Sequence, residues 1–444
     1  MKRALIVILI FLPTVLWAQE PWSLEQCIQY ALQNNLQIKQ QELAVKTSEG
    51  QLRQSKLSTL PNLNFSGNHA YSFGRVTNYK TNEKENENSQ STSFSLNSSL
   101  NLFDGFQLYN TQKQDKFNLQ ASTFDVDKIK NNTALLVASA YLQILYQLEV
   151  VDVSKKQVEQ SQMQVDRTTK LYKAGSVPEG TLLEVEALLA SDELQLINAQ
   201  SQLELNYLSL AQLLEIKNPS EFSIVKPLIP DTDSTIMLMT PVEIFKSAEV
   251  SMPQIQSSQY RVKSAEMGLK VAKGLYYPSL TLNASYNTGA QRYINSNNPL
   301  LTSDPFFTQI KDNATTTVAL GLSIPIFNRG SNQFRVSSAK ISLDNAQLNL
   351  ETEKNTLYKD IQQAYTDAVG AQKKLAANLK NKLANEEAFR YSENKFNVGL
   401  INAFDYITAK NNFSKAETNL LQAKYELVFK YKILDFYKGV PLKL

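Results

Sequence analysis

The sequence predicts an α+β membrane protein in which one unit of long coiled-coil helices and two membrane-spanning β-strands occurs twice. Three observations carry this prediction. Short motifs recur at a nearly constant offset, two long stretches have helical periodicity with almost no glycine or proline, and four segments alternate apolar and polar residues. The predicted protomer is therefore a tandem repeat with four transmembrane strands.

The repeat is visible as motifs that return in the same order. Pro61, in a Leu-Pro-x-Leu segment, returns as Pro278 in a Tyr-Pro-x-Leu segment, at an offset of 217 residues. A constant offset that persists along the chain indicates a duplication, which predicts internal pseudosymmetry. The later motifs return at an offset of 224 residues: Phe103 as Phe327, Tyr141 as Tyr365 and Gly175 as Gly399.

Each copy contains one very long helix. The chain has no glycine or proline between Gly105 and Gly175, and between Gly330 and Gly399 it has only Gly370. About 70 residues at ~1.5 Å each make a helix on the order of 100 Å long, which exceeds the width of a single globular core. Such helices must pack along their lengths as coiled coils.

Heptad spacing supports this packing. An apolar residue recurs every seven positions from Val137 to Tyr172, and the matching seam of the second copy is broken by Lys382. The helix after each turn carries a fuller heptad, in which Asp192 is the one polar residue. We interpret these stripes as core seams and not as ligand sites.

Each long helix is expected to end at a glycine, Gly175 or Gly399, which can adopt the left-handed conformation that stops a helix. Another helix follows within a few residues, and in the first copy Pro178 suits its first turn. Because the turns are so short, the chain must reverse, which predicts two antiparallel hairpins with blunt tips.

Ahead of each long helix the period changes from helical to two. The alternation occupies positions 63–73 and 94–102 in the first copy and 280–286 and 318–326 in the second. Each run is expected to form a strand of roughly 10–13 residues, which is the length that a tilted strand needs to cross a bilayer. The polar segments 80–91 and 289–314 between the paired strands are predicted to be solvated external loops.

The N-terminus predicts a signal peptide over residues 1–18, in which Lys2 and Arg3 precede an apolar stretch and a small residue. It is too short to span a membrane as a helix, and no other apolar run is expected to reach that length. We place the first repeat at 19–214, an irregular proline-containing linker at 215–240, the second repeat at 241–439 and a tail at 440–444. The mature chain is then periplasmic, secreted, or held in the outer membrane by strands.

Composition argues against catalysis and against a nucleic-acid partner. Without Lys2 and Arg3 the chain has 43 basic residues (45 less two) against 42 acidic ones. His69 is the one histidine, which is too few for a histidine-based triad or a metal site. The single Cys27 excludes an internal disulfide and is expected to be a small buried residue. We expect no enzyme activity, no metal site and no cofactor.

The order of these features resembles the TolC family of outer-membrane efflux proteins. The resemblance rests on a signal peptide, a doubled helix–strand–loop–strand–long helix–turn–helix unit, the Leu-Pro-x-Leu motif and a Tyr/Phe-x-x-Gly turn, from about Ser23 to Gly439. It implies a homotrimer whose twelve strands close one barrel without sheet edges, continued by a hollow periplasmic α-barrel. It further implies a passive outer-membrane exit duct for small molecules, supplied by an inner-membrane transporter through a periplasmic adaptor.

By similarity, the adaptor docks at the two helical tips. The family's usual Val-Gly-Leu is kept in the second tip and reads Ala-Gly-Ser in the first, which weakens the expectation for the first tip. The matching positions are Gly175, Ser176 and Val177 in the first tip and Gly399, Leu400 and Ile401 in the second.

The resemblance also implies a periplasmic gate of inward acidic residues near the tips. Glu386 matches one such acid by position, and Phe389 stands one turn later. Asp166 resembles a residue that links the helices in the first copy. A solvated Glu386 beside a core Phe389 is an equally good interpretation.

Two alternatives to a small-molecule duct remain open. The same fold could serve type I protein secretion, and the neighbouring transporter gene would separate the two roles. The second alternative is a periplasmic coiled-coil adaptor or structural stalk without a pore. Such a stalk would not be extracted from the outer membrane as a trimer.

Overall fold

The computed structural model describes residues 21–77, 82–86, 88–217, 222–227, 239–294 and 302–443. These residues form two compact units, and each unit takes segments from both halves of the chain. The first unit draws its described residues from Met1–Gln41, Val126–Pro253 and Lys354–Leu444, and the second from Glu42–Asp125 and Gln254–Glu353. The proposed signal peptide and most of the proposed linker lie outside the described residues.

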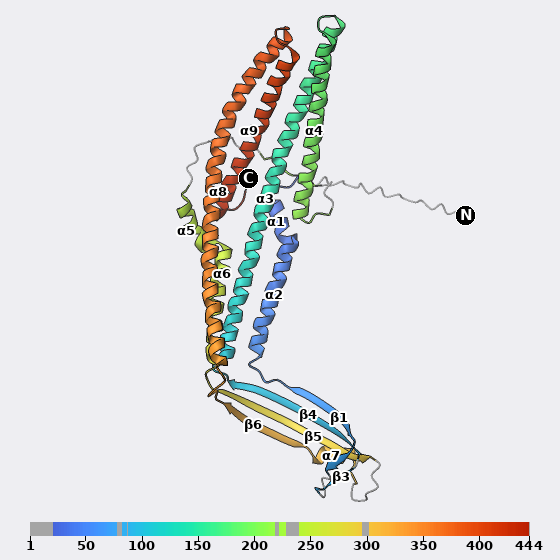
Figure 1. Ribbon diagram of the computed structural model, residues 1–444, viewed down its shortest axis with the longest axis vertical. Coiled ribbons are helices and arrows are strands. Elements are labelled where there is room, and N and C mark those ends of the chain that lie inside the picture. Colours follow the sequence, from blue (N-terminus) through green and yellow to red (C-terminus); the bar gives the residue numbers. More distant parts are fainter. Residues whose placement is uncertain are drawn as a thin grey trace, which may run out of the picture. The chain divides into compact units, whose positions relative to one another are not determined.

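Helices dominate the first unit, and the second unit contains the sheet (Figure 1). The helices are α1 (Leu24–Asn34), α2 (Leu36–Leu57), α3 (Gln107–Lys173), α4 (Glu179–Leu213), α5 (Pro241–Ser251), α6 (Pro253–Gly274), α7 (Phe306–Asp312), α8 (Ser331–Asn397) and α9 (Ala403–Tyr437). The strands are β1 (Asn64–Ser72), β2 (Arg75–Thr77), β3 (Lys84–Asn86), β4 (Asn88–Phe103), β5 (Ser279–Ile294) and β6 (Thr315–Ser323).

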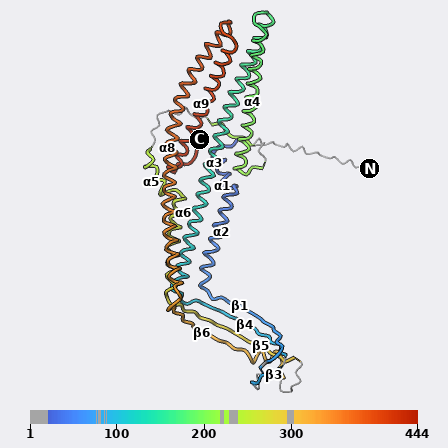
Figure 2. Tube along the Cα trace, viewed as in Figure 1, coloured from blue at the N-terminus to red at the C-terminus, as the bar shows by residue number. Residues whose placement is uncertain are grey.

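The duplication is confirmed at the level of individual helices. α3 and α8 both have 67 residues, α4 and α9 both have 35, α2 and α6 both have 22, and α1 and α5 both have 11. Even the helix starts repeat, because α1 and α5 each begin with a capping box, built on Ser23 and Gln26 and on Thr240 and Glu243. The trace in Figure 2 shows α3 with α4, and α8 with α9, as two hairpins.

The core of the first unit forms around α3. Val137, Tyr141 and Ile144 are buried there against residues of α1, α4 and α9. The Tyr141 hydroxyl lies 2.7 Å from the Val225 carbonyl oxygen and 3.2 Å from that of Trp22. It therefore ties the chain before α1 and the described middle segment of the linker, 222–227, to the long helix.

α3 is more apolar than the sequence suggested. One 18-residue window in it has a mean hydropathy of 1.5, enough to cross a membrane by length and composition. The prediction that no apolar run beyond the signal peptide reaches that length is therefore wrong. However, 44% of the window is buried inside the protein, and α3 supplies much of the core, so helix packing explains its hydrophobicity.

The second unit contains a four-stranded antiparallel sheet in the order β1-β4-β5-β6. β4 and β5 have 16 residues each, whereas β1 and β6 have nine, so the predicted strand lengths are wrong in both directions. The loop predictions for 80–91 and 289–314 are also wrong in part. β3 and the start of β4 occupy the first segment, and the end of β5 and α7 occupy the second.

α7 takes the place of a longer β6. Pairing between β5 and β6 ends at Asn287 and Thr315. Beyond that point the amide of Gln309 accepts a hydrogen bond from the Gln291 N–H (2.9 Å) and donates one to the Gln291 carbonyl (3.0 Å). The Asn313 amide donates to the Gly289 carbonyl at 2.8 Å. Side-chain amides thus satisfy backbone groups that a neighbouring strand would otherwise bind.

Candidate functional site

The two faces of the four-stranded sheet differ sharply in chemistry. Residues paired in register lie on the same face, and faces alternate along each strand. One face, which we call the apolar face, carries Leu282 opposite both Leu100 and Leu320. The other, the polar face, is rich in Ser, Asn and Thr, with pairs such as Asn64–Asn97, Ser95–Asn287 and Ser285–Thr317.

The apolar face is exposed in the single chain. Val318, Leu320 and Leu322 of β6 expose 69%, 65% and 64% of their surface. His69 lies on this face, with its Nδ1 hydrogen-bonded to the Thr92 hydroxyl at 2.7 Å. A contiguous apolar surface of this kind marks contact with a membrane or a partner.

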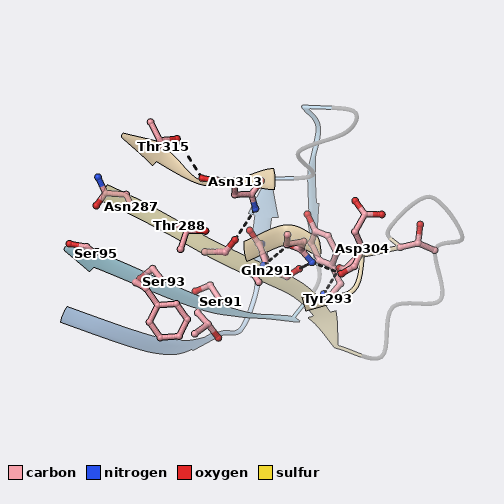
Figure 3. A pocket seen from close by; sticks show the side chains of 17 residues that line it. Ser91, Ser93, Ser95, Asn287, Thr288, Gln291, Tyr293, Asp304, Asn313 and Thr315 are labelled. Atoms are coloured by element: carbon pink, nitrogen blue, oxygen red, sulfur yellow. Dashed lines mark hydrogen bonds between the residues drawn. The ribbon is translucent and has the colours of Figure 1, made fainter. Parts of the chain in front are cut away.

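The polar face contains a recess at the α7 end of the sheet (Figure 3). It encloses about 700 Å³ and is lined mainly by hydroxyl and amide groups, with Asp304 as its one carboxylate among the described residues. Ser91 and Ser93 come from β4, Gln291 from β5 and Gln309 from α7. Such a lining can form hydrogen bonds with polar solutes and water, but it has no paired acid and base for catalysis.

The two helical tips have the same backbone geometry. Gly175 and Gly399 have φ angles of 72° and 77°. At the first tip the Gly175 N–H donates to Tyr172 O (2.8 Å) and the Ser176 N–H to Leu171 O (2.9 Å). The second tip repeats both bonds from Gly399 and Leu400. Each turn is thus a Schellman motif, which requires the left-handed glycine that the sequence predicted.

The surfaces of the tips differ. Val398, Leu400 and Phe404 of the second tip expose 70%, 73% and 70% of their surface, while Ile401 packs against an aromatic cluster. The first tip presents Gly175 and Ser176 as exposed residues and Val177 as a half-buried one. The second tip is therefore the more apolar of the two and the better candidate for protein binding.

The proposed gate residues do not meet in a single cluster of contacts. The Asp166 carboxylate is exposed and accepts a hydrogen bond from the Gln162 amide at 2.9 Å. Glu386 forms an ion pair with Lys382 at 2.7 Å and keeps 43% of its side chain exposed. Phe389 is buried against Tyr406 and is stacked on Phe413. It is therefore a core residue, as in the interpretation that pairs a solvated Glu386 with a core Phe389.

A further link near Asp166 was not predicted. The neighbouring Arg167 of α3 donates a hydrogen bond to the Asn397 carbonyl at the end of α8, over 3.0 Å. Glu417 faces the Lys382–Glu386 pair, and burial raises the pKa of its carboxyl group. Charged groups of both hairpins therefore gather on the helices that lead to the tips.

One buried polar cluster escaped the sequence analysis, and we call it the clasp. Lys410 of α9 and Asp192 of α4 form an ion pair of 2.6 Å with side chains only 3% and 8% exposed. The Ser161 hydroxyl of α3 contacts both, and Lys410 also donates to the Gln157 carbonyl at 3.3 Å. The clasp joins the hairpin of the first copy to that of the second.

The described residues contain no group of three or more His, Cys, Asp or Glu side chains that could hold a metal. Burial raises the pKa of the Cys27 thiol to about 12, which keeps it protonated and unreactive. We find no arrangement of nucleophile, base and oxyanion donors in the described part of the chain.

Comparison with known proteins gives one family. The family model described as outer membrane efflux protein matches residues 27–215 and 244–437, which is most of the chain. The chain is 22% identical over 334 residues to toxin and drug export protein A of Aggregatibacter actinomycetemcomitans, covering 75% of this chain and 69% of that relative. It is 21% identical over 407 residues to the cation efflux system protein CusC of Escherichia coli, covering 90% and 82% of the two chains.

The fold is also found in solved structures. The outer membrane protein VceC of Vibrio cholerae superimposes with a TM-score of 0.74 at 17% identity, over 94% of this chain and 96% of that one. At this identity the similarity establishes the fold alone.

Proposed function

Because this chain belongs to the outer membrane efflux protein family, we propose that it is the passive outer-membrane exit duct of a tripartite efflux system. The protein is an outer-membrane channel that extends into the periplasm, and it is not an enzyme. The proposal adds the oligomeric assembly, the partner proteins and the route of the exported molecules. Three chains close one barrel, a periplasmic adaptor binds the helical tips, and an inner-membrane transporter provides the energy and the small-molecule cargo.

The two-faced sheet with free edges carries this proposal. β1 and β6 are the edge strands, each nine residues long, and they run antiparallel to each other. β6 of one chain can therefore pair with β1 of the next chain, and three chains give a closed barrel of twelve strands. The apolar face then contacts lipid and the polar face lines a water-filled passage.

The alternatives fit the structure less well. A periplasmic stalk would leave the apolar face of the sheet in water, which is costly for a surface of this size. A type I secretion duct would use the same fold for a polypeptide. We favour small molecules because the recess in the polar face presents mainly hydroxyl and amide groups, which suit hydrated solutes.

We propose that the second tip is the main adaptor site, with Leu400 as its anchor. The substitution Leu400→Asp places a charge where an apolar contact is buried on docking. It should weaken adaptor binding by about tenfold or more, as loss of an interfacial anchor does. We expect cells that depend on this variant to accumulate a fluorescent efflux dye as a deletion strain does.

Two controls make this test specific. Leu400→Met preserves the apolar surface and should retain export, whereas Ser176→Asp probes the more polar first tip. The Leu400→Asp protein must still be extracted from the outer membrane as a trimer. Full export by the Leu400→Asp variant would refute adaptor docking at Leu400. A wild-type protein that is extracted only as a monomer would refute the proposed trimeric duct.

We propose that Glu386 and Asp166 contribute to a periplasmic gate, with Phe389 as packing behind it. Charge removal by Glu386→Gln should lower the cation-over-anion permeability ratio of single channels by about twofold or more, because a ring of carboxylates concentrates cations. Glu387→Gln is the matched control, since it removes the same charge one residue away, where Glu387 pairs with Arg390 at 2.7 Å. Identical permeability in Glu386→Gln and wild-type channels would refute the gate.

A further inference from the structure

A row of aromatic side chains leads from the apolar face of the sheet onto the start of α3. Phe103 of β4 pairs with Leu280 of β5, which places it on the apolar face beyond a bulge in the strand. Its ring makes an edge-to-face contact with Phe106, with centroids 5.2 Å apart. Phe106 and Tyr109 expose 59% and 56% of their surface. Phe106 directly precedes α3 and its carbonyl accepts a hydrogen bond from the Asn110 N–H, so Tyr109 follows it in the first turn of the helix.

Two cations lie at the end of this row. The Lys113 ammonium lies 4.4 Å from the centroid of the Tyr109 ring, one turn further along α3. The hydrogen bond from Lys113 lowers the pKa of the Tyr109 phenol, and the charge of Lys270 on α6 lowers it further. The two helices run side by side here, because the Gln114 amide of α3 lies next to Gly268 of α6 and Gln107 lies next to Gly274. Lys270 of α6 is therefore near the same phenol as Lys113, within one compact unit.

The two lysines have no acidic partner among the described residues. Within the described ranges, no carboxylate lies within ion-pair distance of the Lys113 or Lys270 ammonium group. The nearest acidic residue along the chain toward the strand, Asp104, accepts a hydrogen bond from the Leu108 N–H at 2.7 Å. Both ammonium groups are therefore available to an anionic ligand beside the exposed aromatic row.

The depth of these groups in a bilayer identifies their ligand. Aromatic residues at the end of an apolar strand lie at the membrane–water interface. A lysine one turn beyond extends its ammonium group to the level of the lipid phosphates. An anionic headgroup would satisfy both lysines, whereas a zwitterionic headgroup brings its own cation and gains less.

We propose that Lys113 and Lys270, with Tyr109 between them, bind the phosphate of an anionic phospholipid at the periplasmic rim of the membrane sheet. The site rests on the proposed function in one respect, because it requires the apolar face to contact lipid. Its role is to fix the depth of the barrel in the membrane at the junction between strand and helix.

Native mass spectrometry of the full trimer tests the site directly. The protein is released from detergent that contains equal amounts of phosphatidylglycerol and phosphatidylcholine, and the lipids retained are counted. Wild-type protein should retain phosphatidylglycerol about tenfold more than phosphatidylcholine, because each lysine near a lipid surface adds to the attraction. Lys113→Gln/Lys270→Gln should abolish that preference, and Lys113→Arg/Lys270→Arg should preserve it.

Three outcomes would overturn the proposal. Wild-type protein would retain the two lipids equally, or the control Lys155→Gln/Lys415→Gln, which removes two exposed charges in the other unit, would lose the preference equally. Displacement of the lipid by inorganic phosphate at equal concentration would assign the site to a free anion. Channel conductance in bilayers is recorded in parallel. A conducting trimer without lipid preference refutes this site alone, and a protein that never conducts refutes the duct.

Discussion

Replacing Lys410 by methionine is expected to lower the free energy of unfolding by about 3–5 kcal/mol, because it leaves the Asp192 carboxylate buried without a counter-charge. The geometry leaves little room for rescue by water. Both side chains are more than nine-tenths buried, and their charged atoms lie 2.6 Å apart. The remaining neighbour of the carboxylate would be the Ser161 hydroxyl, which can donate one hydrogen bond but carries no charge.

The loss of unfolding free energy should be smaller when both charges are removed together. The double substitution Lys410→Met/Asp192→Leu leaves apolar groups of similar size, and such replacements of buried ion pairs are often neutral. The Ser161 hydroxyl can then bond to the Gln157 carbonyl one turn earlier. Urea unfolding of the detergent-solubilised protein, followed by helical circular dichroism, measures all three variants.

Lys374→Met is the matched control for a surface pair. Lys374 lies 3.1 Å from Glu426 but exposes 62% of its side chain, so its loss should cost less than about 1 kcal/mol. Equal destabilisation by Lys374→Met and Lys410→Met would contradict the account of the clasp. So would a double variant that is no more stable than Lys410→Met.

The pairing of Asp192 with Lys410 in the clasp could not be predicted from the sequence. Asp192 was visible as the polar residue in an apolar seam, yet its partner lies 218 residues away. Lys410 directly follows the seam position Ala409, where a lysine is ordinarily solvated. In the other copy the equivalent positions are Ala416 and Glu186. No periodicity could therefore reveal this pair, because it breaks the repeat.

The helices were predictable because their signals are local. Glycines at the tips, capping residues and heptad stripes all lie within the elements that they specify. α7 depends instead on contacts with a distant strand edge, through the amides of Gln309 and Asn313. A polar segment such as 289–314 gives the same sequence signal whether it is a loop or covers an edge, so the prediction failed there.

The second large effect is expected at Gly105, where β4 turns into α3. Gly105 has a φ of 67°, and a side chain there would collide with the Gly274 carbonyl oxygen and lie 2.9 Å from Tyr277 Cβ. Gly105→Ala should lower the free energy of unfolding by about 3 kcal/mol, since backbone strain and a clash with a rigid turn add together. The measurement is the same urea titration.

The second copy supplies an internal control for this prediction. Its equivalent turn also has two consecutive residues with positive φ, Arg329 at 57° and Gly330 at 79°. A side chain built at Gly330 meets no atom within 4 Å, so Gly330→Ala should cost only the strain of a left-handed residue, about 1–2 kcal/mol. Arg329 already occupies the position that matches Gly105, which shows that a side chain is tolerated there when nothing crowds it.

The difference between the two alanine variants isolates the clash. In the first copy the turn after β4 packs against the turn between α6 and β5, so Gly105 and Gly274 approach each other from different copies of the repeat. If Gly105→Ala and Gly330→Ala lose equal stability, the close approach of Gly105 to Gly274 does not contribute to stability, and the two turns can move apart. If Gly105→Ala loses about 1–2 kcal/mol more, this glycine pair holds the start of α3 against the end of α6, where Lys113 and Lys270 must lie together.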